Sequence, residues 1–150
     1  MLLGFKPQFA EPIIKGTKIH TLRNEPKRMP KIGETLHMYT GLRTRNCKLI
    51  RNDLKLVSIT RVTLITRWDH TLNIHSSKLI LRYPNYNVNL DNESMQEFFI
   101  NDGFKDQSGF TEFWKKNWAK DEIPLLCFSE LYMFSWKDTN YSGLIDDLPF

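Results

Sequence analysis

The feature that most limits the fold is a long β-prone region in the middle of the chain, with no helical pattern inside it. Residues 47–51 and 54–68 are rich in branched apolar side chains, which predicts two or three strands there. Residues 72–83 are expected to add a hairpin, and residues 83–89 an Asn-rich loop. Because parallel strands need long crossovers that are usually helical, this region predicts an antiparallel or mixed sheet.

Short elements precede this region. Apolar or alternating runs predict three short strands: Leu2–Phe5, Lys18–Arg23 and Glu34–Tyr39. Between the first two, the apolar spacing after Phe9 predicts a short helix that Gly16 ends. Strict alternation would place Lys18 and Thr21 on opposite faces of their strand. Residues 24–33 contain two prolines and several basic side chains, which indicates an exposed loop.

Helical spacing returns late in the chain. The run Ser94-Met-Gln-Glu97 matches a capping box, and Asn101-Asp-Gly103 is expected to end that helix. A second helix begins near Ser108. Its aromatic stripe is interpreted as core packing rather than a base-stacking platform: Phe110, Phe113, Trp114 and Trp118. With a last strand over 125–136, the order predicts an α+β fold: a small mixed or antiparallel β-barrel with a short N-terminal helix and two late helices packed on it.

The size and charge of the chain limit its organisation. A length of 150 residues suits one core, and we place one domain over residues 1–137 and an acidic, loosely ordered tail over 138–150. Residues 1–67 hold 14 Lys and Arg against 4 Asp and Glu, whereas residues 68–150 hold 7 against 13. The basic half is a candidate phosphate-binding surface, and two solvated faces of opposite sign are the alternative.

Several kinds of site have no signature in the sequence. It contains no Gly-x-x-x-x-Gly-Lys-Ser/Thr phosphate loop, no Gly-x-Ser-x-Gly elbow and no His-Glu-x-x-His motif. Cys47 and Cys127 lack metal-ligand spacing and are interpreted as buried free thiols, so we expect no disulfide scaffold, metal or cofactor. Without a signal peptide or a long apolar run, the chain is expected to be cytoplasmic and to have no membrane span.

A series of short motifs resembles the ASCH domain, a relative of the PUA-like RNA-associated barrels. The series begins with the aromatic strand and the helix ending in Gly16. It continues with four further motifs: Gly16-x-Lys-x-x-Thr-x-Arg, Gly33-x-x-Leu, Gly41-x-Arg-Thr and Asp102-Gly-Phe. The resemblance covers most of the chain, and it implies a small PUA-like barrel that acts on RNA or on modified nucleosides.

The resemblance also implies an activity, the metal-independent hydrolysis of the N4-acetyl amide of cytidine. Lys18 and Thr21 match the family's catalytic Lys and Thr, and we place Asp102 at the position of its carboxylate, where the family's amidohydrolases carry Glu. In this role Thr21 attacks the acetyl carbonyl and Lys18 accepts its proton, which requires a lowered lysine pKa. Asp102 would orient the lysine or the leaving amine.

Further residues are candidates for contact with a nucleic acid or ligand. His20 and Arg23 flank the expected catalytic pair. A basic group with one aromatic residue is expected to follow a phosphate backbone and stack on a base: Lys27, Arg28, Tyr39, Arg43 and Arg45. A non-catalytic RNA-binding module is the alternative function, and a ribonuclease is a further one. A protein partner bound through the acidic tail also stays open.

Overall fold

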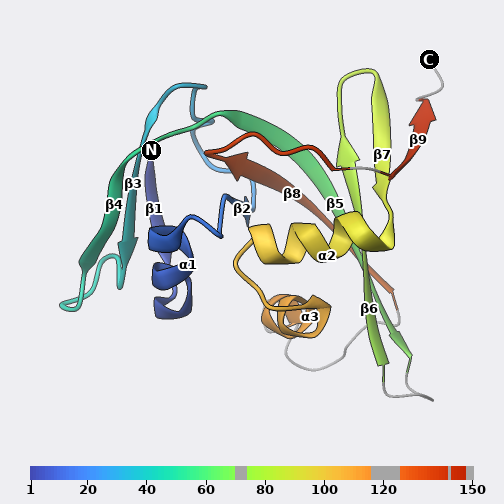
Figure 1. Cartoon of the computed structure of the whole chain (residues 1–150), viewed down its shortest axis with the longest axis horizontal. Coiled ribbons are helices and arrows are strands. Elements are labelled where there is room, and N and C mark those ends of the chain that lie inside the picture. Colours follow the sequence, from blue (N-terminus) through green and yellow to red (C-terminus); the bar gives the residue numbers. More distant parts are fainter. Residues whose placement is uncertain (70–73, 116–125, 142, 148–150) are drawn as a thin grey trace.

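The computed structural model describes residues 1–69, 74–115, 126–141 and 143–147, and its elements form an α+β fold (Figure 1). The strands are β1 (Leu2–Phe5), β2 (His20–Arg23), β3 (Thr35–Thr40), β4 (Lys48–Lys55), β5 (Ser58–Asp69), β6 (Ile74–Arg82), β7 (Tyr86–Leu90), β8 (Leu126–Ser135) and β9 (Gly143–Asp147). The helices are the 3-10 turn η1 (Pro7–Phe9), α1 (Ala10–Lys15), α2 (Asn92–Asn101) and α3 (Gln107–Lys115).

The strands pair into two sheets, as expected for an antiparallel or mixed arrangement. One sheet has the order β1-β3-β4, with β1 parallel to β3, and the other has the order β2-β8-β5-β6-β7-β9 and is antiparallel throughout. Figure 1 shows α1 beside β1 and β3, and α2 and α3 in front of the long strands. The predicted α+β class is therefore confirmed, whereas closure into a barrel stays a prediction.

Two connections link the sheets. The backbone passes from β4 into β5 through Leu56, whose amide binds the Glu34 carbonyl at 2.9 Å, and Val57, whose amide binds the Ser135 carbonyl at 2.7 Å. At the other side, the Arg23 guanidinium on β2 donates to the Gly4 carbonyl of β1 at 2.7 Å. These contacts hold the edge strands β1 and β2 side by side, where the cavity described below opens.

The structure corrects two predictions for residues 72–90. Residues 74–82 form one strand, β6, and residues 86–89, expected to lie in a loop, belong to β7. In β7 the buried Val88 and Leu90 alternate with the half-buried Asn87 and Asn89, which is the period of a half-buried strand. The Asn content concealed this alternation, because it is typical of turns.

The late helices begin and end close to the predicted positions. Asp91, rather than Ser94, caps α2, since its side chain accepts a hydrogen bond from the Ser94 amide at 2.8 Å. From α3, Phe110 is fully buried in the core, with Phe98 and Phe99 of α2 beside it, as the stripe predicted. Trp118 of that stripe lies outside the described residues. No helix in the described ranges combines the length and the apolar character that a membrane crossing needs.

Part of the expected loose tail belongs to the fold. Residues 143–147 form β9, which pairs with β7, and Tyr141 packs its ring against Phe98 with 5.2 Å between centroids. The expectation of loose order is therefore wrong for this segment, because β7 offers an unpaired edge to it. The boundary at residue 137 stays a prediction. The predicted burial of Cys47 is also wrong, since it is exposed in the turn before β4, and the side chain of Cys127 lies outside the described residues.

Candidate functional site

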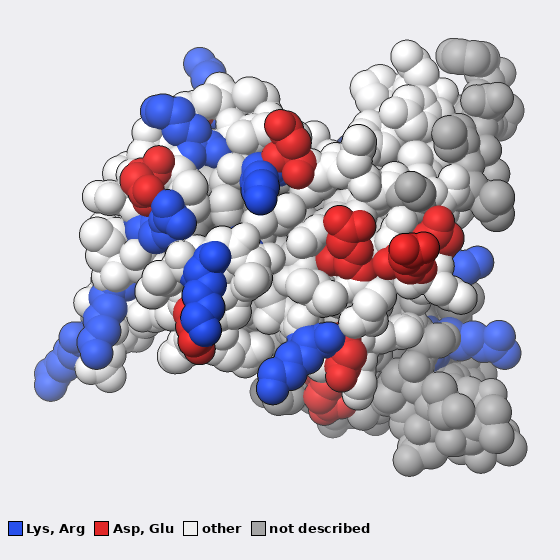
Figure 2. Space-filling model, in the orientation of Figure 1, with Lys and Arg blue, Asp and Glu red and all other residues white. Residues whose placement is uncertain are grey.

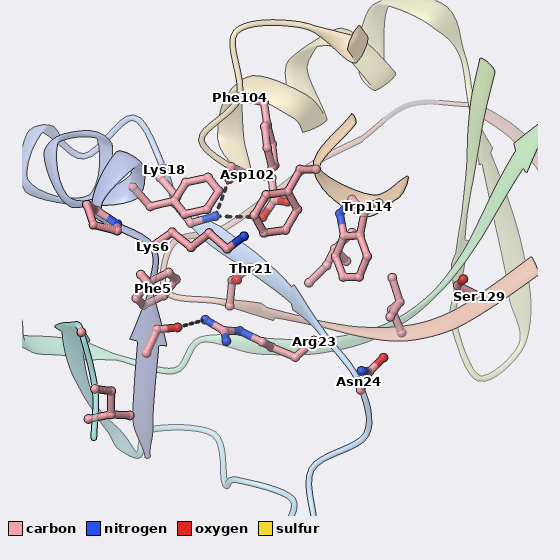
Figure 3. Close-up of a pocket in the computed structure, with 18 residues that line it drawn as sticks. Phe5, Lys6, Lys18, Thr21, Arg23, Asn24, Asp102, Phe104, Trp114 and Ser129 are labelled. Carbon is pink, nitrogen blue, oxygen red and sulfur yellow. Dashed lines mark hydrogen bonds and ion pairs between the residues drawn. The ribbon is translucent and has the colours of Figure 1, made fainter. Parts of the chain in front are cut away.

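A cavity of about 800 Å³ opens between β1, β2, β8 and the segment joining α2 to α3 (Figure 3). Its walls are largely aromatic: Phe5, Phe9, Phe104, Phe113 and Trp114. The polar side chains that line it come from four separate segments and include Lys6, Lys18, Thr21, Arg23, Asp102 and Ser129. A mostly apolar pocket with a few convergent polar groups is the usual form of a small-molecule site.

The cavity contains a buried ion pair between Lys18 and Asp102. The Lys18 ammonium lies 2.9 Å from Asp102 Oδ1 and also donates to the Asp102 carbonyl oxygen, and both side chains are almost fully excluded from solvent. Figure 3 shows the lysine reaching toward Asp102. Because an isolated buried charge is very costly, the attraction between the two groups stabilises their charged forms in this position.

Backbone contacts bring these two residues together across 84 positions of sequence. Lys18 follows α1, whose C-cap residue Gly16 is left-handed, and the Ile19 amide donates to the Asn101 carbonyl at 2.8 Å. Asp102 is itself the C-cap of α2. Gly103 follows it with φ +91°, and a Cβ there would lie 2.9 Å from the Lys18 side chain. The two helices end at Gly16 and near Gly103, as predicted, and these helix ends position Lys18 and Asp102.

Burial and pairing shift the pKa values of both groups. Burial lowers the pKa of Lys18, and the attraction of Asp102 offsets only part of that effect. Burial alone would raise the pKa of Asp102, but Lys18 and His20 together hold it below its usual value. The pair therefore combines a stable carboxylate with an ammonium that releases its proton more readily than a lysine in water.

His20 lies behind the ion pair and does not line the cavity. Its ring is fully buried, with Nε2 2.6 Å from the Tyr141 hydroxyl and Nδ1 3.4 Å from Asp102 Oδ1. The Asn101 amide donates to the Tyr141 oxygen at 2.9 Å, whereas His20 Nδ1 has no hydrogen-bond partner in the described chain. Burial lowers the pKa of His20. The predicted ligand contact is thus replaced by a contact with Asp102.

Thr21 shares the cavity with Lys18, which corrects the expected alternation. Strand β2 begins at His20, so Lys18 precedes the strand and its side chain does not follow the two-residue period. Both residues line the cavity, and Figure 3 shows the Thr21 hydroxyl on the side of Lys6 and Lys18. The predicted half-buried strand is also more buried than expected, since His20, Thr21 and Leu22 are all buried between the two sheets and the late helices.

Arg23 is a second cation that lines the cavity, and its side chain is half-buried. One terminal nitrogen of its guanidinium binds the Gly4 carbonyl, and the group lies 4.9 Å from the centre of the Phe5 ring. Its Nε is buried and has no hydrogen-bond partner in the described part of the chain. Burial lowers the pKa of Arg23 from its usual value. Arg23 therefore lies near Lys18, as predicted, and its Nε–H group has no acceptor in the described chain.

The other predicted contact residues lie outside the cavity. Lys27 and Arg28 are exposed on the loop before β3, where Arg28 binds Glu34 at 2.6 Å. The N-terminal amine, the Lys31 amide and Arg28 lower the pKa of Glu34 to about 2. Arg43 and Arg45 are exposed on the turn between β3 and β4, with Arg43 left-handed at φ 67°, and Tyr39 is half-buried on β3. Figure 2 shows Lys and Arg concentrated over the β1–β3–β4 side.

Sequence reasoning missed three residues of the site. Lys6 follows β1 directly and lines the cavity, and no motif in the sequence marks it. Trp114 lines the cavity as well, and a stripe interpreted as core gives no signal for this. Tyr141 lies in the acidic tail, and no local pattern connects it to His20.

Within the described ranges, no three His, Cys, Asp or Glu side chains gather as a metal site would require. Comparison of the chain with protein-family models, with curated proteins and with solved structures finds no match.

Proposed function

We propose that the protein is a cytoplasmic, ASCH-type PUA-like barrel that hydrolyses the N4-acyl amide of a cytidine without a metal. The observation that carries the proposal is the convergence of Lys18, Thr21 and Asp102 on one aromatic-walled cavity. The aromatic walls suit a planar base, whose faces stack on such rings. The contacts that join the edges of the two sheets, through Arg23 at one side and Leu56 at the other, support the barrel.

In the proposed reaction, Thr21 Oγ attacks the acetyl carbonyl carbon while the neutral amine of Lys18 accepts the hydroxyl proton. The carbonyl π electrons move to oxygen. When they return, the bond to N4 breaks and Lys18 donates its proton to the departing amine, which leaves as cytidine. Water then hydrolyses the acetyl ester of Thr21, so that acetate is released and the threonine is regenerated.

The electrostatics of the ion pair favour this cycle. Burial lowers the pKa of Lys18, which increases the fraction of neutral amine at a given pH. Asp102 accepts the Lys18 hydrogen bond at 2.9 Å and so fixes the direction of the amine. His20 and Tyr141 lie behind Asp102 and hold the carboxylate in place.

The test is release of cytidine from N4-acetylcytidine by the purified protein. We expect turnover by the wild type and a loss of at least about 100-fold in kcat for Thr21→Val and for Lys18→Met, the usual effect of removing a nucleophile or base. Thr21→Ser retains a hydroxyl and should retain part of the activity. The matched control is Thr17→Val, because Thr17 is exposed outside the cavity. Turnover that survives both Thr21→Val and Lys18→Met would exclude these roles.

A second candidate function is binding of RNA without catalysis. It is favoured by the exposed Arg43 and Arg45, which form no ion pair with another described residue and lie on the basic side of the molecule. Contacts of this kind with phosphates weaken steeply as salt increases. We expect Arg43→Ala with Arg45→Ala to reduce the affinity for single-stranded RNA and the salt dependence of binding. A salt-independent interaction, or none, would rule out this function.

A further inference from the structure

The cavity carries more positive charge than an uncharged ligand can balance. Three cations, Lys6, Lys18 and Arg23, line it, against the single carboxylate of Asp102 among the described lining residues. Asp102 is already paired with Lys18 at 2.9 Å. Lys6 and Arg23 are therefore left without an anionic partner. An acylated nucleoside is neutral, so its binding would not balance their positive charges.

The hydrogen-bond donors of the cavity that lack a partner also favour a ligand that is rich in acceptors. Arg23 Nε and Trp114 Nε1 are buried and have no hydrogen-bond partner in the described chain, although buried donors are nearly always paired. Both residues line the cavity, and both atoms only donate. The Lys6 ammonium lies 4.9 Å from the centre of the Phe113 ring, and it has no ion pair with a described carboxylate. A ligand with several acceptor oxygens would provide partners for the positive charges of Lys6 and Arg23.

The placement of these groups separates two parts of the cavity. Arg23 is fixed at the β1–β2 edge by its bond to Gly4, and Figure 3 shows the Lys6 side chain crossing the same opening above Thr21 and Arg23. Trp114 lies across the cavity from them in that view. The catalytic candidates Lys18 and Asp102 are almost fully buried, whereas Lys6 is exposed and Arg23 is half-buried.

We infer that the cavity binds a phosphorylated pyrimidine nucleoside, with its phosphate between Lys6 and Arg23 and its base near Thr21. This inference rests on the proposed function and specifies its substrate as a nucleotide rather than a nucleoside. Phosphate oxygens accept charge-assisted hydrogen bonds from lysine and arginine, which are stronger than neutral ones. A free nucleotide and the 5′ end of an RNA strand present the same chemistry.

The test is isothermal titration of the full chain with cytidine 5′-monophosphate and with cytidine, which differ only in the phosphate. We expect the nucleotide to bind at least about tenfold more tightly, equivalent to about 1.4 kcal/mol. Lys6→Met should lower the nucleotide affinity more than the cytidine affinity and so narrow this difference. The matched control is Lys78→Met, because Lys78 is exposed on β6 outside the cavity and should leave the difference unchanged.

A 5′-phosphorylated oligocytidine distinguishes the two sources of the phosphate. Binding as tight as that of the monophosphate supports an RNA end, and exclusion of the oligonucleotide supports a free nucleotide. Equal affinities for nucleotide and nucleoside, no binding of the nucleotide, or equal effects of Lys6→Met and Lys78→Met would overturn the inference. The proposed function is tested independently by hydrolysis. It would be excluded if neither N4-acetylcytidine nor its 5′-monophosphate were hydrolysed, even if the nucleotide bound more tightly than the nucleoside.

Discussion

At the scale of single residues, the site depends on one buried cluster whose charges are only partly balanced. Asp102 accepts from Lys18 and faces His20 at 3.4 Å, so one carboxylate influences both bases. Burial lowers the pKa of each base, whereas Asp102 raises it. Changes to single members of this cluster should therefore appear as changes in pH dependence, beyond any loss of activity or stability.

The first prediction concerns Asp102→Asn. Without the carboxylate, the attraction that offsets part of the effect of burial is lost, and the pKa of Lys18 falls further. Because the proposed reaction needs the neutral amine, the rising limb of kcat/KM against pH should move to lower pH, while the maximal rate falls. The profile of hydrolysis against pH measures this. Asp106→Asn, at an exposed position just before α3, is the control. In this variant the rising limb of kcat/KM against pH should stay where it is in the wild type. A limb that stays in place or moves to higher pH would contradict the role of Lys18 as base.

The second prediction concerns the stability of the protein in mild acid. The folded state keeps His20 neutral because burial lowers its pKa below 6.5, whereas the unfolded chain takes up a proton near that value. Below pH 6.5 the unfolded state therefore binds more protons, and the free energy of unfolding should fall by up to about 1.4 kcal/mol per pH unit from this site. Urea titrations between pH 7.5 and about 5 measure it.

The control variants separate His20 from other titrating groups. His20→Gln should be less stable at pH 7.5, because it disturbs the contact with Tyr141, and should lose this part of the slope. His37→Gln, at an exposed position on β3, should keep the slope of the wild type. An unchanged slope in His20→Gln would show that another group causes the acid sensitivity.

At the scale of elements, helix ends build the site. The C-terminus of α1 delivers Lys18 and the C-terminus of α2 delivers Asp102, and each helix is followed by a left-handed glycine. Gly16 has open space where a Cβ would lie, whereas a Cβ at Gly103 would lie 2.9 Å from both Lys18 and Phe9. The same backbone conformation thus occurs once at a free surface and once against the ion pair.

The third prediction compares these two glycines. Gly16→Ala should cost about 1 kcal/mol of unfolding free energy, the cost of a left-handed backbone for an L-residue. Gly103→Ala should cost about 2–4 kcal/mol, because the methyl group also displaces the Lys18 and Phe9 side chains. Urea denaturation of both variants measures the difference. Equal costs would mean that the contact of Gly103 with the lysine is readily relieved.

At the scale of the whole molecule, the C-terminal segment completes the buried side of the site. Tyr141 binds His20 and packs on Phe98, and β9 covers the free edge of β7. Tyr141 contacts Asp102 only through His20, and neither His20 nor Tyr141 lines the cavity. The fold beyond residue 137 therefore contributes to the site without lining the cavity.

The fourth prediction concerns a chain ending at residue 137. Removal of Tyr141 and β9 should lower the free energy of unfolding by about 2–4 kcal/mol, because the buried His20 and Phe98 lose their cover. Tyr141→Phe keeps the ring and should cost about 1–2 kcal/mol, the loss of its hydrogen bonds. Thermal and urea denaturation measure both. A truncated chain as stable as the full chain would show that residues 138–150 do not stabilise the fold.

The sequence alone determined the class of fold and the ends of its helices. The uninterrupted β-prone region predicts antiparallel pairing, and Gly16 and Gly103 mark helix ends, because these preferences act between neighbouring residues. Where the local signal is mixed, as in the Asn-rich β7, the pairing partner decides the structure.

Only the tertiary structure decided the site. Lys18 meets Asp102 across 84 positions and His20 meets Tyr141 across 121, and strand alternation by itself would have separated Lys18 from Thr21. Burial of a lysine, a carboxylate and an imidazole is unfavourable for each residue separately, so no local pattern predicts it. It becomes stable when two helix ends, one strand and the C-terminal segment bring the three groups together and exclude water around them.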